Sequence, residues 1–199
     1  MYNYGKEELD YLRLRDPKLG ELFDEFGIIR REEMKNPFEA LICSIVGQQI
    51  SAKAQESAIK KIKALIGRIS PSNIISCELA ELRACGLSER KALAIVDAAK
   101  LFANLKLSKK RLLEMQAPQI EKILTSIKGV GPWTAEMLMI FALDKPDILS
   151  YADFGIRKAL SLLHDIEKLD KKTFEKFRAL YSPFGSVASL YLWELANKA

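Results

Sequence analysis

The chain has 199 residues, of which 49 % are hydrophobic and 29 % are charged. This composition is typical of a folded globular protein and excludes the disordered and fibrous classes. The sequence has no run of about 18 apolar residues, and its charged first residues are unlike a secretory signal peptide. We therefore expect a cytoplasmic protein that does not enter a membrane.

The formal net charge of +5 favours a polyanionic partner. Each lysine or arginine that contacts a phosphate releases condensed counterions, so a basic protein gains affinity for nucleic acid. The three cysteines are Cys43, Cys77 and Cys85. Their spacing is not that of a metal site, and the single histidine, His164, cannot complete one. We expect the cysteines to be reduced and mostly packed in the interior.

Helical periodicity dominates the sequence. Apolar residues recur three and four positions apart, whereas alternating segments and hairpin-turn dipeptides are scarce. Capping side chains or first-turn prolines mark helix starts at Asp16-Pro17, Asn36-Pro37, Ser51, Ser70-Pro71, Ser88, Ser108 and Ala117-Pro118. These signals predict an all-α fold of about ten helices.

A polar junction separates two of the predicted helices. Residues 37–49 are apolar on most faces, which predicts a helix in the protein interior. Ser51 begins a second helix directly afterwards, so Gln48, Gln49 and Ile50 form a tight connection. A helix end that reaches solvent is the ordinary explanation for such a pair of glutamines.

The tetrapeptide Gly129-Val130-Gly131-Pro132 predicts a tight turn between two helices. Two glycines one residue apart allow backbone conformations that other residues avoid, and a proline fits the first turn of the next helix. Backbone N–H groups at that helix start would form an anion site suited to a DNA phosphate. A plain helical hairpin with a glycine cap is the alternative interpretation.

Asp153 precedes a predicted helix over residues 154–163, where its ordinary role would be that of an N-cap. The combination of LTSIKGVGPWTAEMLMIFAL (124–143) with SYADFGIRKAL (150–160) resembles the helix-hairpin-helix-Gly/Pro-Asp (HhH-GPD) superfamily of DNA glycosylases. Within that superfamily it is most similar to the alkyl-base, or 3-methyladenine, group. NPFEALICSIVGQQIS (36–51) and SPFGSVASLYLWELA (182–196) are similar to the first and last core helices of that group.

The resemblance implies a single HhH-GPD unit made of two intimate, intertwined helical subdomains. One would span roughly residues 36–145 and contain the hairpin, and residues 1–35 with 146–199 would form the other. Asp153 falls on the catalytic carboxylate of the family, which also begins a helix. Trp133 stands where bifunctional relatives place a lysine that forms a Schiff base, so lyase activity is not expected.

The resemblance also assigns binding roles. The base pocket would include Trp133, Met137 and Trp193, whose aromatic members attract a cationic base. The residues expected at the DNA are Lys128, Gly129, Gly131 and Thr134 of the hairpin and Gln48, Gln49, Ile50 and Ser51 of the junction. Either Gln49 or Ile50 would fill the gap left by the flipped nucleotide. The main-chain carbonyls of Thr125, Ile127 and Val130 would hold Na⁺ or K⁺.

The implied activity is that of a monofunctional DNA glycosylase in base excision repair. It would hydrolyse the N-glycosidic bond of flipped-out alkylated purines such as 3-methyladenine in double-stranded DNA, with a water assisted by Asp153. We expect a monomer, nucleoid-associated in a prokaryote, with no organic cofactor. No iron–sulfur cluster is expected, because the four-cysteine pattern of other glycosylases is missing. The alternatives are a non-catalytic helix-hairpin-helix module, a glycosylase for oxidised or deaminated bases, or a plain helical interaction protein.

Overall fold

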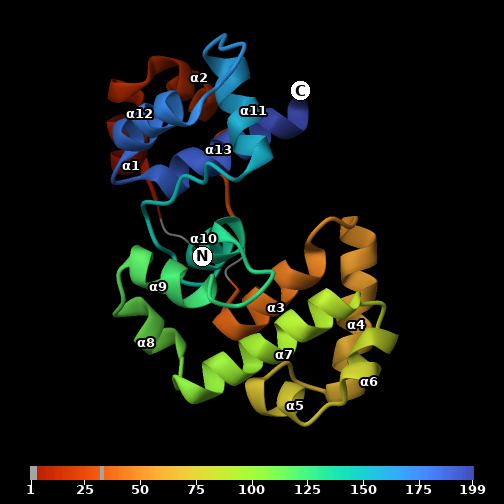
Figure 1. Ribbon diagram of the computed structural model, residues 1–199. Helices are drawn as coiled ribbons and strands as arrows, with labels where there is room; N and C mark the ends of the chain where they lie inside the picture. Colours follow the sequence, from red (N-terminus) through yellow and green to blue (C-terminus); the bar gives the residue numbers. More distant parts are fainter. Residues whose placement is uncertain (1–3, 32–33) are drawn as a thin grey trace. The chain divides into compact units, whose positions relative to one another are not determined.

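The computed structural model describes residues 4–31 and 34–199, and no strand occurs in these ranges. The helices are α1 (Lys6–Arg15), α2 (Pro17–Phe26), α3 (Pro37–Gly47), α4 (Ala52–Ile66), α5 (Pro71–Ile75), α6 (Leu79–Ala84), α7 (Glu89–Asn104), α8 (Lys109–Leu113), α9 (Ala117–Leu124), α10 (Pro132–Phe141), α11 (Phe154–Leu163), α12 (Lys171–Tyr181) and α13 (Gly185–Lys198) (Figure 1). The all-α prediction is confirmed. The described chain has more helices than the ten or so expected, because the starts of α1, α6 and α12 were not among the predicted ones.

The predicted helix starts are confirmed where a side chain caps the backbone. Asp16 accepts the Leu19 N–H at the start of α2, and Asn36 accepts two backbone N–H groups at the start of α3. Serines cap α4, α5, α7 and α8 in the same way. The start of α6 was not predicted, because Glu81 caps it from within the helix by accepting the Glu78 N–H.

The helices form two compact units. The terminal unit consists of Met1–Glu33 and Asp144–Ala199, and the central unit is Met34–Leu143. The hairpin and the glutamine junction therefore belong to the central unit, whereas Asp153 and Trp193 belong to the terminal unit.

Helix α3 is the centre of the central unit and packs against α4, α7 and α10 (Figure 1). Its buried residues are Pro37, Phe38, Ala40, Leu41, Ile42, Ile45 and Val46. A helix that is apolar on most faces must have neighbours on several sides, which agrees with the interior position predicted for it. The last turn of α3 is consequently held by three surrounding helices.

Helix α13 is the centre of the terminal unit, where it packs against α1, α2, α11 and α12 (Figure 1). Every residue from Gly185 to Leu192 is buried. The ring of Tyr191 meets those of Tyr4 and Phe23 edge-on, and its hydroxyl donates to the Gly27 carbonyl at 2.8 Å. Trp193 is the residue that comes directly after this buried segment of α13.

Asp16 holds a buried polar cluster in the terminal unit, where its side chain is only 4 % exposed. One carboxylate oxygen caps α2, and the other accepts the Tyr181 hydroxyl at 2.5 Å and lies 3.0 Å from His164 Nε2. Burial and this contact raise the pKa of Tyr181 above its ordinary value, so the phenol remains a donor. The cluster joins α2 to α12 and to the end of α11.

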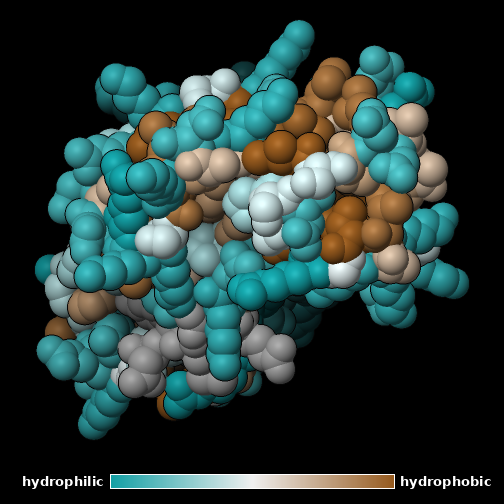
Figure 2. All heavy atoms as spheres, turned by 90° about the horizontal axis from the view of Figure 1, so that it is seen from below, coloured by the Kyte–Doolittle hydropathy of each residue, from teal (hydrophilic) through white to brown (hydrophobic). Residues whose placement is uncertain are grey.

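No helix of the described ranges has the length and apolar character needed to cross a membrane. Hydrophilic side chains cover most of the face shown in Figure 2, and hydrophobic side chains gather there in a few patches. Two exposed apolar residues lie next to residues that the sequence marks as functional: Ile50 is 41 % exposed and Phe154 is 72 % exposed.

We expect the substitution Asp16→Ala to lower the free energy of unfolding by about 2–4 kcal/mol. It removes the cap of α2 and leaves the buried Tyr181 hydroxyl without its acceptor. Urea denaturation of the variant measures this loss. Asp24→Ala is the matched control, because Asp24 is a carboxylate of the same unit that pairs with Arg13 at the surface and should change stability little. Equal losses in the two variants would contradict the assignment.

Candidate nucleic-acid interface

The hairpin joins α9 to α10 in the central unit, and one of its glycines carries the turn. Gly129 has φ +95°, in the left-handed region that favours glycine. Gly131 has φ −97° and ψ 177°, an extended conformation that any residue adopts. The expectation that both glycines are needed for the turn is therefore wrong for Gly131. What Gly131 provides is space, because a Cβ built on it would meet no atom within 4 Å.

The start of α10 has no side-chain cap, unlike that of α3 or α4. Pro132 occupies its first turn, where a missing N–H costs nothing, and the start of a helix carries a partial positive charge. The open space at Gly131 lies directly beside this helix start. Lys128, an exposed residue, precedes the turn and adds a positive charge. These features together suit a phosphate oxygen.

Carbonyl groups of the same turn suit a hard cation. Thr125, Ile127 and Val130 lie between the end of α9 and the start of α10. The Ile127 carbonyl accepts the Val130 N–H at 3.0 Å, but no described residue donates to the carbonyl of Thr125 or of Val130. Na⁺ and K⁺ bind neutral carbonyl oxygens. The carbonyl groups of this turn therefore fit the predicted ion.

The glutamine junction contacts the hairpin within the central unit. Gln48 Nε2 donates to the Gly129 carbonyl at 3.1 Å and to Thr134 Oγ1 at 3.2 Å. Thr134 is only 2 % exposed, so its hydroxyl serves this internal contact. The side chain of Gln48 is therefore turned towards the hairpin rather than outwards.

The next three residues of the junction reach the surface. Gln49 is exposed and has φ +55°, which is uncommon for a residue with a side chain. Ile50 is 41 % exposed. Ser51 caps α4 by accepting the Ala54 N–H at 3.3 Å. The structure thus brings the predicted junction and hairpin residues into one surface of the central unit.

Trp133 and Met137 lie one turn apart on α10, so they share a face of that helix. Trp133 is partly exposed, whereas Met137 is only 6 % exposed. A flexible thioether at this position adapts to the shape of whatever neighbours it.

Asp153 begins α11 in the terminal unit, as predicted from its position. Its Oδ1 accepts the Ile156 N–H at 2.9 Å, and the residue is 8 % exposed. The N-terminal end of a helix carries a partial positive charge, which favours a carboxylate there. The cap also fixes the orientation of the carboxylate, so the structural and catalytic interpretations of Asp153 are compatible.

Gly155 allows Trp193 to lie close to Asp153. No motif in the sequence had marked this glycine as functional. A Cβ built on Gly155 would lie 3.2 Å from Asp153 Oδ1 and 3.4 Å from Trp193 Cδ1. A side chain there would push between the carboxylate and the indole. The available signal was a glycine in the first turn of a predicted helix, a position where glycine weakens the helix unless it serves close packing.

Trp193 also has a cation beside it. The Arg31 guanidinium carbon lies 5.7 Å from the centre of the indole ring, and the same guanidinium pairs with Glu194 at 2.9 Å. The terminal unit therefore presents a carboxylate and an aromatic ring together, with an ion pair next to the ring.

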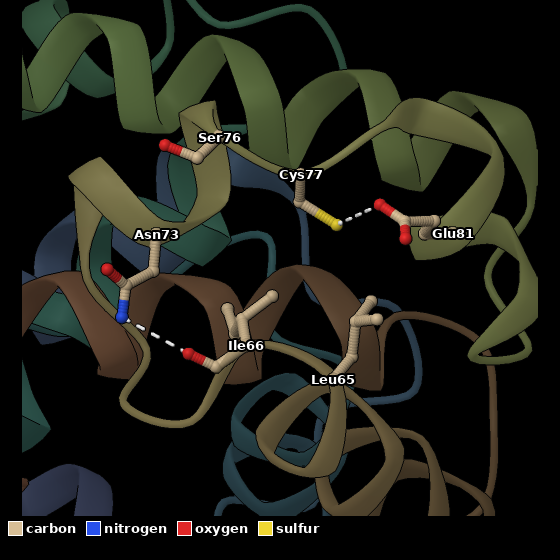
Figure 3. A pocket seen from close by; sticks show the side chains of 6 residues that line it. All are labelled: Leu65, Ile66, Asn73, Ser76, Cys77 and Glu81. Carbon is tan, nitrogen blue, oxygen red and sulfur yellow. Dashed lines mark hydrogen bonds between the residues drawn. The ribbon is translucent and has the colours of Figure 1, made fainter.

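A separate pocket of the central unit, of about 270 Å³, is lined by Leu65, Ile66, Asn73, Ser76, Cys77 and Glu81 (Figure 3). Its polar side chains have partners: Asn73 Nδ2 donates to the Ile66 carbonyl and Cys77 Sγ donates to Glu81 (Figure 3), while Ser76 Oγ donates to the Ser72 carbonyl. Burial and the neighbouring carboxylate raise the pKa of the Cys77 thiol to about 11. A thiol that stays protonated is a poor nucleophile and a poor metal ligand.

Within the described ranges, no cluster of three His, Cys, Asp or Glu side chains is placed to hold a metal.

The helical fold, the open hairpin and the capped aspartate define a class of helical DNA-repair proteins. The family model described as "HhH-GPD superfamily base excision DNA repair protein" matches residues 42–183. The chain therefore belongs to the HhH-GPD superfamily of base excision DNA repair proteins, as the sequence motifs predicted.

Relatives with assigned names agree with this family. The chain is 30 % identical over 191 residues to DNA-3-methyladenine glycosylase 1 of Schizosaccharomyces pombe, covering 92 % of this chain and 82 % of that protein. It is 27 % identical to the DNA-3-methyladenine glycosylase of Saccharomyces cerevisiae, with 94 % and 78 % covered.

Solved structures are similar over nearly the whole chain. The S. pombe 3-methyladenine DNA glycosylase Mag1, in complex with abasic DNA, matches with a TM-score of 0.84 at 29 % identity, covering 95 % of this chain and 96 % of that one. The DNA-3-methyladenine glycosidase of Bacillus halodurans matches with a TM-score of 0.86 at 30 % identity, covering 96 % and 89 %. The 8-oxoguanine glycosylase/lyase of Clostridium acetobutylicum, at 20 % identity and a TM-score of 0.79, shares the fold.

The two hairpin glycines should respond differently to alanine. We expect Gly129→Ala to lower the free energy of unfolding by about 1–2 kcal/mol, because the side chain is strained at positive φ. Gly131→Ala should leave stability nearly unchanged but weaken DNA binding, because its methyl group occupies the space beside the α10 N–H groups. Thermal unfolding and fluorescence anisotropy with duplex DNA measure the two effects. If Gly131→Ala bound DNA with wild-type affinity, the prediction that a phosphate binds at this position would be wrong.

Proposed function

We propose that this protein is a monofunctional alkyl-base DNA glycosylase, which removes alkylated purines such as 3-methyladenine from double-stranded DNA. The observation that carries the proposal is Asp153, a capped and nearly buried aspartate with Trp193 packed beside it across Gly155. The names of the relatives, DNA-3-methyladenine glycosylases at up to 30 % identity among those given above, support the alkylated substrate.

The reaction begins with the target nucleotide turned out of the duplex. Rotation of the nucleotide costs a few kcal/mol and costs least for a damaged base, which stacks poorly. Either Gln49 or Ile50, which are both exposed on the central unit, would fill the gap. The uncapped start of α10 and Lys128 would hold the neighbouring phosphate. The surrounding stack then remains intact while the base is outside it.

Bond cleavage needs a negative charge at the sugar and a water. The C1′–N bond breaks with its electron pair leaving on the base, and water adds to C1′ and loses a proton. The Asp153 carboxylate stabilises the oxocarbenium-like sugar and orients or deprotonates that water. A purine alkylated at N3 or N7 carries a positive charge and departs as a neutral base, so it needs no general acid.

His164 is unsuited to act as that acid. It is the single histidine of the chain, it lies 3.0 Å from Asp16 and it stacks against Phe177 within the polar cluster of the terminal unit. Selectivity for a cationic base would instead come from the face of Trp193 in the terminal unit, whose quadrupole attracts positive charge.

The reaction is expected to stop at the abasic site. A glycosylase that also cleaves the strand uses an amine that forms a Schiff base with the sugar, and Trp133 stands in the position of that lysine. The chemistry needs no organic cofactor. Na⁺ or K⁺ on the carbonyls of Thr125, Ile127 and Val130 would add positive charge beside the bound phosphate. We propose that the protein acts as a monomer.

Asp153→Asn should reduce base release by at least about a hundredfold, because the carboxylate charge is lost. Asparagine keeps the helix cap, so folding and DNA binding should remain. Chromatography of bases released from methylated duplex DNA measures the rate. Asp170→Asn is the matched control, since Asp170 is an exposed N-cap of α12 in the same unit. A normal rate in Asp153→Asn would exclude the mechanism, and DNA binding without base release by the wild type would favour a non-catalytic module.

Strand cleavage can be followed on the same substrate. We expect DNA treated with the wild-type protein to accumulate abasic sites and to break only after alkali is added. The physical reason is that Trp133 stands in the position of the lysine, and an indole cannot form the Schiff base that strand cleavage needs. Denaturing gel electrophoresis before and after alkali distinguishes the products. Breaks without alkali, trapped by borohydride as a covalent complex, would instead indicate a bifunctional enzyme.

A further inference from the structure

Lys91 lies against the end of α3 and contacts the glutamine junction. Its Nζ donates to the carbonyls of Val46 and Gln48, both at 2.7 Å. The residue sits in the first turns of α7 and is half-buried. Burial lowers the pKa of Lys91 below its ordinary value, a cost that its two carbonyl acceptors offset. Carbonyls in the last turn of a helix carry partial negative charge, so a lysine is well suited to this end of α3.

Gln48 is held from two sides. Its carbonyl accepts from Lys91, while its side-chain amide donates to the Gly129 carbonyl and to Thr134 Oγ1. Helix α7 also reaches the hairpin, because a Cβ on Gly129 would lie 3.8 Å from the Cβ of Ala94. Three hydrogen bonds thus join α7, the junction and the hairpin into one network of the central unit.

The residue that follows is held in an unfavourable conformation. Gln49 has φ +55°, and such a conformation in a residue with a side chain persists only where the surroundings determine it. The Ile50 N–H donates to the Gly47 carbonyl at 3.4 Å, which closes the turn. Gln49 and Ile50 are both exposed, so the network ends next to the two residues that are predicted to enter the duplex.

We propose that Lys91 and Gln48 are positioning residues that hold the Gln49–Ile50 turn ready to enter the duplex, at a set distance from the phosphate bound by the hairpin. The inference rests on the glycosylase function proposed above and adds to it two residues with no direct DNA contact. A turn that is already ordered pays no conformational entropy when it enters the gap. In this proposal Gln48 acts as a link between the junction and the hairpin.

Lys91→Met tests the proposal, with Lys100→Met as the matched control because Lys100 is an exposed cation on the same helix. The probe is a duplex that carries 2-aminopurine beside a tetrahydrofuran abasic analogue, whose fluorescence rises when a protein side chain displaces the stacked base. Lys91→Met should lower the ratio of inserted to non-inserted complex about tenfold, equivalent to about 1.4 kcal/mol. Lys100→Met should insert like the wild type.

A second readout separates positioning from phosphate contact. A lysine that contacts a phosphate changes the slope of log affinity against log salt concentration by about one when it is removed. Lys91→Met should leave this slope unchanged. Lys91→Arg retains a positive charge and donors, and it should restore part of the insertion. A changed slope would make Lys91 a DNA contact and would overturn the proposal.

Gln48→Glu provides an independent variant if Lys91→Met is too unstable to assay. It keeps the size of the side chain but removes the N–H donors to Gly129 and Thr134. We expect a similar loss of insertion, and the double variant should lose less than the sum of the two single losses, because both act through one turn. Normal insertion in both single variants, with base release by the wild type intact, would overturn this inference alone. Absence of both insertion and base release in the wild type would overturn the proposed function as well.

Discussion

The backbone N–H groups at helix starts are the constraint on which the rest of this structure depends. Each helix leaves several of them without an internal partner, and a buried one must be satisfied by another group. Asp16 and Asn36 meet this need with side chains in the two units. The start of α10 has no such side chain. The partial positive charge of this helix start is therefore open to an external anion.

The same constraint gives Asp153 its fixed orientation. A carboxylate that caps α11 cannot rotate freely, because one oxygen is committed to the Ile156 N–H. Gly155 then allows α13 to bring Trp193 close to that oxygen. The cost is a glycine in the first turn of a helix, which is conformationally unfavourable. A fixed negative charge can stabilise a developing positive charge, as the proposed reaction needs.

The central unit solves a different problem, which is to keep an exposed turn rigid. Buried α3 ends at the junction, and its last carbonyls are bound by Lys91. Gln48 extends the contact to the hairpin. Exposed turns are ordinarily mobile because few interactions hold them. Here the hydrogen bonds on either side of Gln49 order a turn whose own conformation is unfavourable.

The sequence was enough to predict the helical class, most of the helix starts, the hairpin and the position of Asp153 at the start of a helix. These features depend on local chemistry, since capping, proline placement and apolar spacing act within a few residues. Only the tertiary structure decided that Gln48 faces the hairpin, that Lys91 holds the junction and that Gly155 makes room for Trp193. These contacts join residues from 38 positions apart (Gly155 and Trp193) to 86 positions apart (Gln48 and Thr134). No local pattern specifies which distant side chain will meet which carbonyl, because packing of whole helices sets those distances.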